Sequence, residues 1–259
     1  MGEVFTHELW YEPGESMRRL HVYLPDGYES ADERYPVMYF FDGHNLFFDE
    51  WATFGKSWGL KGFLDAWQKP LIIVGMECSH EGDERLNEYC PYSGRKLGHT
   101  IDGIGEQTFQ WVIRDVKPWI DTNLWTWGHR EATAIGGSSM GGLMSLYGVV
   151  AHNDVFSKAA CLSTGIRMWK PQLQRELRAA KIDPDTRVYL SWGENEAGRM
   201  AKKGGDPATE SPEAKAELDY AERLRKAGAD VNVYFQEGGE HNEASWEQQN
   251  DRYLSYLWL

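Results

Sequence analysis

Residues 132–150 read ATAIGGSSMGGLMSLYGVV: a short apolar run, a glycine-rich turn, and then apolar residues at helical spacing. The apolar run suits a buried strand, and the residues after the turn suit a helix. The turn itself, Gly137-Ser138-Ser139-Met140-Gly141, is a G-x-S-x-G pentapeptide. A strand that turns this sharply into a helix strains the backbone at the central serine and needs small residues beside it. The stretch therefore predicts a strand–turn–helix unit that exposes the Ser139 hydroxyl at the edge of a sheet.

The rest of the chain alternates strand-like and helix-like segments. The sequence predicts strands at residues 4–10, 18–24, 35–41, 71–76, 158–162, 187–192 and 231–235. It predicts helices at residues 58–67, 107–123, 171–180, 212–227 and 243–257, an irregular excursion at 78–104 and a surface loop at 198–211. Strands that alternate with helices form a mainly parallel sheet covered on both faces, with chemistry at the carboxyl ends of the strands. We therefore expect an α/β fold.

Size and composition fit one globular domain. With 259 residues, the chain is predicted to form a single domain over residues 1–259. Its N-terminus has neither a basic patch nor an apolar core, and no stretch reaches the length of a membrane span, so we expect a cytoplasmic protein without a signal peptide. The net charge of −13 opposes binding to nucleic acid or to an anionic membrane. The oligomeric state is not determined by the sequence.

Cysteines and histidines show no spacing typical of a metal site. Cys78, Cys90 and Cys161 form no Cys-x-x-Cys pair, so we expect reduced and mostly buried thiols. His80-Glu81 lacks a second histidine four residues on, and the other histidines are scattered. We therefore expect neither a metal nor a cofactor. The 12 tryptophans are expected mainly in the core, with a few exposed ones offering a flat apolar surface to sugar rings or aryl groups.

Ser139 needs a histidine base to become a nucleophile, because a serine hydroxyl is a poor nucleophile at neutral pH. In sheets with a nucleophile at such a turn, the acid and then the histidine follow the serine in the chain. His152 lies along or just after the helix that follows the Ser139 turn, and this helix carries it away from the hydroxyl. His241 follows the last predicted strand and precedes the last predicted helix, at the same sheet edge as Ser139. We expect His241 to be the general base.

The carboxylate that orients the base is expected at the end of the preceding strand. Trp192-Gly193-Glu194-Asn195-Glu196 ends that strand and offers two acids. Glu196 is preferred, because a carboxylate three residues past the strand-ending glycine suits the turn back toward the histidine loop. Glu194 and then Asp206 are the alternatives.

Two backbone N–H groups are expected to form an oxyanion hole. One is that of Met140, next to the nucleophile. The other is expected from the loop that follows the strand at 35–41, from either His44 or Asn45. Gly43 in the same loop is expected to let the backbone approach a substrate closely.

These motifs, in this order, resemble those of the esterase D-like family of putative esterases. The resemblance rests on the turn at Ser139, Asp42-Gly43, the Glu196 turn, and Gly238-Gly239-Glu240-His241 with Trp246 beyond it, and it covers nearly the whole chain. Residues 85–92, RLNEYCPY, also resemble a family stretch that braces the site. The resemblance implies an α/β-hydrolase fold without a large lid, a Ser139–Glu196–His241 triad, and carboxylic ester hydrolysis without a cofactor.

The function expected from these observations is that of a serine carboxylesterase that works through an acyl-enzyme intermediate. Kinship and tryptophan content favour small-molecule substrates such as acetyl or feruloyl esters of oligosaccharides. Two alternatives stay open at this point. One is an acyltransferase that moves the acyl group to a sugar or thiol, and the other is a catalytically idle module that binds glycans.

Overall fold

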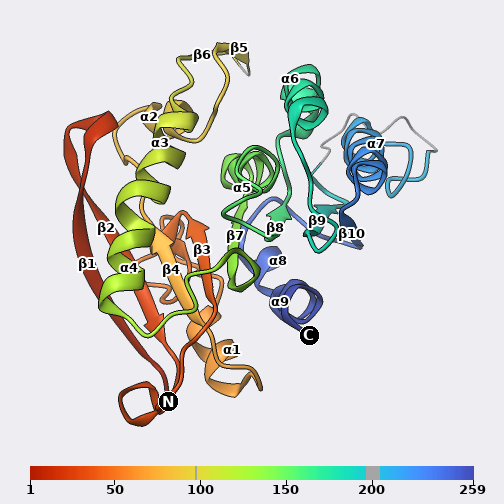
Figure 1. Ribbon diagram of the computed structural model, residues 1–259. Helices are drawn as coiled ribbons and strands as arrows, with labels where there is room; N and C mark the ends of the chain where they lie inside the picture. The colour runs from red at the N-terminus through yellow and green to blue at the C-terminus, as the bar shows by residue number, and fades with distance from the viewer. Residues whose placement is uncertain (97, 197–204) are drawn as a thin grey trace.

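The computed structural model describes residues 1–96, 98–196 and 205–259. Within these residues the main sheet has the strand order β1-β2-β4-β3-β7-β8-β9-β10 (Figure 1). Adjacent strands are parallel except for the pairs β1–β2 and β2–β4. The strands are β1 (Glu3–Tyr11), β2 (Ser16–Leu24), β3 (Val37–Phe41), β4 (Ile72–Met76), β7 (Thr133–Ser138), β8 (Lys158–Leu162), β9 (Arg187–Gly193) and β10 (Asp230–Gln236). The predicted mainly parallel sheet is confirmed.

Helices cover both faces of this sheet. In Figure 1, strands β8 to β10 lie between α6 and α7 on one side and α9 on the other. The helices of the main layers are α1 (Leu60–Ala66), α3 (Gly105–Trp111), α4 (Lys117–Asn123), α5 (Met140–Ala151), α6 (Ile166–Ala179), α7 (Pro212–Ala227), α8 (Glu243–Glu247) and α9 (Asn250–Trp258). The predicted helix over residues 212–227 matches α7, which Gly228 ends in the left-handed conformation.

Strand β3 shows why the sequence specifies two cores. Val37, Tyr39 and Phe41 belong to the hydrophobic cluster that also contains residues of α3, α5, α6 and α7. Met38 and Phe40 belong to the second cluster, with residues of α1 and α9. Side chains alternate between the two faces of a strand, so a continuous apolar run fits a strand that is buried on both sides.

Three predicted segments differ from the structure. The helix expected at 107–123 contains a π-helical turn, Val112–Val116, between α3 and α4. The excursion at 78–104 is not wholly irregular, because it contains α2 (Glu84–Glu88) and the hairpin of β5 (Gly94–Lys96) and β6 (His99–Ile101). The single helix expected at 243–257 is divided into α8 and α9. Gln249 lies between them, 1% exposed, and its side-chain amide is bonded to Gln236 and Tyr189. Of the loop expected at 198–211, residues 198–204 lie outside the described residues.

Several expectations about composition are also met. Cys78, Cys90 and Cys161 are buried and free of disulfides. Six of the 12 tryptophans are buried, and Trp67 and Trp119 are partly buried and packed against the core. The large exposed aromatic residues are Trp10, Trp51, Phe54, Trp125 and Trp127. Among the described helices, none has the length and apolar character that crossing a membrane requires.

Candidate active site

Ser139 lies at the turn between β7 and α5, as the sequence predicts. Its backbone has φ 57° and ψ −122°, a combination that costs a non-glycine residue about 1–3 kcal/mol. The Ser139 N–H donates to the carbonyl of Leu162, 2.9 Å away, which ties the turn to the neighbouring strand. A Cβ atom on Gly137 would lie 2.8 Å from the carbonyl carbon of Gly141, so only glycine fits this close approach. The strained conformation is held in place by the packing around it.

Ser139 faces a cavity of about 620 Å³ at the carboxyl ends of the strands. His241 lines the same cavity, on the loop between β10 and α8. No hydrogen bond joins Ser139 to His241 among the described side chains. Such a bond is often long before substrate arrives and tightens in the complex. The structure therefore places the serine and the histidine at one cavity without a direct bond between them.

His241 is paired with Glu196. Its Nδ1 atom lies 3.3 Å from Glu196 Oε2, and the imidazole is 46% exposed while the carboxylate is 10% exposed. The other carboxylate oxygen, Oε1, accepts hydrogen bonds from the Ser163 hydroxyl at 2.6 Å and from the Gly193 N–H at 2.8 Å. Three donors thus hold Glu196 in one orientation toward the histidine.

The two alternative acids do not reach His241. Glu194 Oε2 accepts from the Gly238 N–H at 2.8 Å, which secures the start of the histidine loop. Asp206 accepts from the Ala208 N–H and the Thr209 hydroxyl within its own turn. Of the three candidates, Glu196 is the carboxylate that the structure brings to the imidazole.

Sequence reasoning missed Ser163, which comes directly after β8 and so lies at the same edge as the catalytic candidates. Its backbone φ of 50° is in the left-handed region. The Ser163 hydroxyl accepts a hydrogen bond from Trp246 Nε1 at 2.8 Å and donates to Glu196. Its position directly after a predicted strand was the one feature of the sequence that could have identified it as a candidate site residue. The role of Trp246 depends on a contact 83 residues distant in the chain, which no local pattern reveals.

The candidate donors of the oxyanion hole lie in two places, at the start of helix α5 and in the short turn after strand β3. Met140 is the first residue of α5, where backbone N–H groups lack partners within the helix. His44 and Asn45 lie in the turn Gly43–Asn45 after β3. The Asn45 N–H already donates to the Asp42 carbonyl at 2.9 Å, which leaves His44 as the better second donor. A Cβ atom on Gly43 would lie 2.3 Å from the carbonyl carbon of Gly75, so the close contact between these two backbones requires glycine.

An ion pair fixes the start of that turn. Arg85 donates to both carboxylate oxygens of Asp42, each at 2.7 Å, and the Asp42 N–H donates to the Tyr89 hydroxyl at 3.1 Å. Burial would raise the pKa of Asp42, but the Arg85 charge and hydrogen bonds outweigh it, so the pKa is lowered. Arg85 and Tyr89 belong to the stretch 85–92, which acts as the expected brace.

The exposed aromatic side chain at the cavity is Phe54, 80% exposed. Trp246, 5% exposed, also lines the cavity. The exposed tryptophans expected to form a flat platform do not line it. Any aromatic contact with a bound molecule would therefore come first from Phe54.

Comparison with known proteins agrees with this architecture. Residues 13–254 match the family described as putative esterase. The chain is 24% identical over 183 residues to the uncharacterised protein YbbA of Bacillus subtilis, covering 69% of each chain. It is 24% identical over 253 residues to the endo-1,4-beta-xylanase/feruloyl esterase of Xylanibacter ruminicola, covering 95% of this chain and 30% of that protein. The chain thus spans less than a third of that relative's length.

A solved structure shows the same fold. The IroE-like serine hydrolase from Shewanella oneidensis superposes with a TM-score of 0.74 at 19% identity, covering 96% of this chain and 78% of that one. The α/β-hydrolase fold expected from the sequence is confirmed, and the described residues include no large lid. The match to the family supports a carboxylic ester hydrolase. With its family profile matched from residue 13 to residue 254, the chain belongs to the putative esterase family.

Proposed function

We propose that this chain is a serine carboxylesterase with Ser139 as nucleophile, His241 as general base and Glu196 as the orienting acid. The observation that carries the proposal is the His241–Glu196 pair at the cavity that Ser139 lines. Glu196 accepts the Nδ1 proton of His241, which leaves Nε2 unprotonated and able to take the Ser139 proton. Glu196 also stabilises the imidazolium that forms.

The reaction follows from these roles. Ser139 Oγ attacks the ester carbonyl carbon while His241 takes its proton, and the carbonyl oxygen becomes an oxyanion. The backbone N–H groups of Met140 and His44 stabilise that charge, and losing one such donor typically costs about 10²–10³ in rate. The C–O bond to the alcohol breaks as His241 gives its proton to the leaving oxygen. Water, activated by His241, then releases the acid from the acyl-enzyme and restores Ser139.

Substitution of Ser139 tests the nucleophile. Ser139→Ala is expected to lower kcat for p-nitrophenyl acetate by at least about 10³-fold, because it removes the proposed attacking oxygen. Ser138→Ala is the matched control, since the neighbouring serine is 5% exposed and has no proposed role in the reaction. A fluorophosphonate probe should label the wild type and Ser138→Ala but not Ser139→Ala. Labelling that persists in Ser139→Ala would assign the nucleophile elsewhere.

For the substrate, we propose short-chain acyl or feruloyl esters of carbohydrates. Two observations support an aryl or sugar group: the exposed Phe54 side chain at the cavity, and the feruloyl esterase named among the relatives. Acetyl, butyryl and feruloyl esters assayed side by side would rank the acyl groups. Phe54→Ala should lower kcat/KM for the feruloyl ester more than for the other two. The same assays with an added sugar or thiol acceptor would detect acyl transfer, the second candidate activity.

The proposed catalytic unit is a single domain over residues 1–259. The residues that line the cavity range from Asp42 to Trp246, so segments from most of the chain are needed to build it. The cytoplasmic location expected from the sequence stays a prediction.

A further inference from the structure

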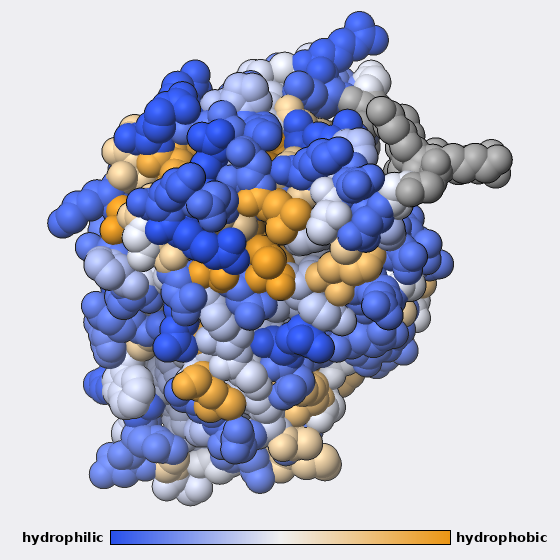
Figure 2. All heavy atoms as spheres, turned by 90° about the vertical axis from the view of Figure 1, so that its right-hand side faces the viewer, coloured by the Kyte–Doolittle hydropathy of each residue, from blue (hydrophilic) through white to orange (hydrophobic). Residues whose placement is uncertain are grey.

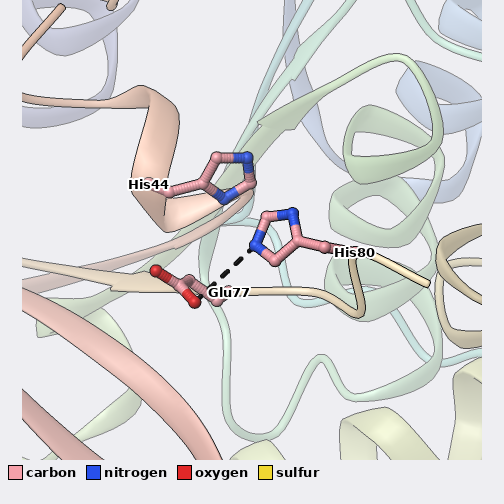
Figure 3. Close-up of side chains that lie close together, drawn as sticks. All are labelled: His44, Glu77 and His80. Atoms are coloured by element: carbon pink, nitrogen blue, oxygen red, sulfur yellow. Dashed lines mark ion pairs between the residues drawn. The ribbon is translucent and has the colours of Figure 1, made fainter. Parts of the chain in front are cut away.

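Three side chains of metal-ligating type lie together beside the proposed catalytic residues. His44, Glu77 and His80 each offer one donor atom, and these atoms all lie within 4.8 Å of one another. Figure 3 shows the two imidazole rings and the carboxylate turned toward a common point. His44 and His80 line the 620 Å³ cavity.

The sheet explains why residues from separate segments meet here. Strands β3 and β4 are parallel neighbours in which Phe41 is opposite Met76. His44 follows the end of β3 by three residues, and Glu77 comes directly after the end of β4. His80 is three residues beyond Glu77 in the next loop. Both strands end at the same edge of the sheet, and this brings the three residues together. Their spacing along the chain does not predict the cluster.

His44 holds an unpartnered nitrogen toward the cluster. The residue is 5% exposed, and its Nε2 atom is bonded to the Thr53 hydroxyl at 2.9 Å. Its Nδ1 atom is buried and has no hydrogen-bond partner in the described part of the chain. A buried polar atom without a partner is destabilising, and a bound metal ion would give this nitrogen a partner.

Glu77 is oriented by a third histidine, His21, which lies outside the cluster. Its Oε1 atom is bonded to His21 Nε2 at 2.6 Å, while Oε2 lies 3.7 Å from His80 Nε2. A carboxylate fixed through one oxygen presents the other in a defined direction. Hydrogen bonds of this kind, here at Glu77 and at His44, commonly orient metal ligands from outside the coordination shell.

We propose that His44 Nδ1, Glu77 Oε2 and His80 Nε2 bind a divalent first-row transition-metal ion, with Zn²⁺ as the best-matched ion. Two imidazole nitrogens and one carboxylate oxygen suit Zn²⁺, whereas Mg²⁺ and Ca²⁺ prefer oxygen ligands only. Tetrahedral bonds of about 2.0–2.1 Å place ligand atoms about 3.3 Å apart. The cluster must therefore contract slightly, and the 57% exposed His80 side chain has the freedom to do so.

Three protein ligands leave a fourth position on Zn²⁺ for another molecule. Because His44 and His80 line the cavity, that position takes water or an oxygen atom of a molecule bound there. The site is a second binding feature of the cavity, separate from the Ser139–His241–Glu196 group.

Calorimetric titration of the metal-free full chain with ZnCl₂ tests the site. We expect one Zn²⁺ per chain in the wild type, and affinity at least 10-fold weaker in His80→Gln and Glu77→Gln. His99→Gln is the matched control, because His99 forms an exposed pair with Asp83 at 2.7 Å and does not line the cavity. Ser139→Ala and His241→Gln should bind Zn²⁺ like the wild type, so that failure of the proposed catalytic roles leaves the metal result unaffected.

Cobalt gives a second readout that does not depend on activity. Co²⁺ bound at a four-coordinate nitrogen and oxygen site should produce visible absorption bands in the wild type and in His99→Gln, but not in His80→Gln. Because the His80 side chain is exposed, His80→Gln is expected to fold. It therefore keeps the test usable if Glu77→Gln unfolds. Absence of stoichiometric binding by the wild type, or equal binding by His80→Gln, would overturn the proposal.

Discussion

The hydroxyl of Ser163 is the link that holds the proposed acid in place. It receives a hydrogen bond from the buried indole of Trp246 and gives its own to Glu196 Oε1. The Ser163 side chain therefore cannot turn away without leaving the indole N–H unpaired. We infer that Ser163 acts through Glu196, as a positioning residue and not as a catalytic one.

Removal of this hydroxyl should lower turnover and spare binding. A hydrogen bond to a charged group contributes about 1.5–3 kcal/mol, so we expect Ser163→Ala to reduce kcat for a p-nitrophenyl ester by at least about 10-fold. KM should stay within about twofold, because Ser163 does not line the cavity. Ser255→Ala, which removes an exposed hydroxyl bonded to Asp251, serves as the control and should leave kcat unchanged. A variant that raised KM with kcat intact would contradict the positioning role.

At the scale of elements, Glu106 connects helix α3 to the end of α5. Its carboxylate accepts from Tyr147 at 2.7 Å and Gln110 at 2.7 Å, and lies 3.0 Å from His152 Nε2. Burial would raise the pKa of Glu106, but these hydrogen bonds outweigh it and lower the pKa from 4.5 to about 2. His152 thus has a structural partner far from Ser139, as its place after the elbow helix predicts.

This connection makes a pH-dependent contribution to the free energy of unfolding. The unfolded state binds more protons at Glu106 between pH 2 and 4.5, so the contribution is complete above about pH 4.5 and is lost as pH falls toward 2. Because the side chain is 45% exposed, Glu106→Gln should cost only about 1 kcal/mol at pH 6.5.

Urea unfolding of wild type and Glu106→Gln at pH 6.5 and 3.5 would measure this difference. It should be clearly smaller at the lower pH. Glu222→Gln, at an exposed pair with Lys226 on α7, is the control and should change little at either pH. A difference of the same size at both pH values would show that the ionised form of Glu106 is not the stabilising one.

Periodic elements could be predicted from the sequence, and short ones could not. Strands β3 and β7 are defined by continuous apolar runs, and α7 by its period and its terminal Gly228. Helix α2 has five residues, too few for a periodic signal, and it forms around the Arg85–Asp42 pair, whose members are 43 positions apart.

The same limit applies to the site. Ser139 and the His241 loop each have a local signature, so the sequence alone makes them candidates. The strand-end acid stayed open between Glu196 and its alternatives until the structure placed Glu196 beside His241. Ser163 and the cluster of His44, Glu77 and His80 depend on contacts between segments that have no shared pattern. Such residues are found only once the sheet has brought their strands to one edge.

At the scale of the whole molecule, the surface and the cavity have different characters. The face shown in Figure 2 is mostly hydrophilic, with small separated hydrophobic patches. This agrees with 40 acidic and 27 basic residues dispersed along the sequence. The cavity lies at the carboxyl edge of the sheet, and most of the residues that line it belong to loops. The proposed chemistry is thus assigned to a rim built mainly from loops, above the two hydrophobic cores.

The described residues include no large lid over this rim, which predicts simple saturation kinetics on poorly soluble esters. Enzymes with a lid become more active when an interface opens it, because the lid otherwise closes the site. Here the imidazole of His241 is 46% exposed, so solvent and substrate reach it without a large rearrangement. The rate with p-nitrophenyl butyrate should rise hyperbolically and level off through its solubility limit, with no increase on adding an emulsified phase. A lipase with a known lid, assayed in parallel, should show such an increase. A rise of several-fold at the solubility limit with this chain would mean that a covering element controls access to Ser139.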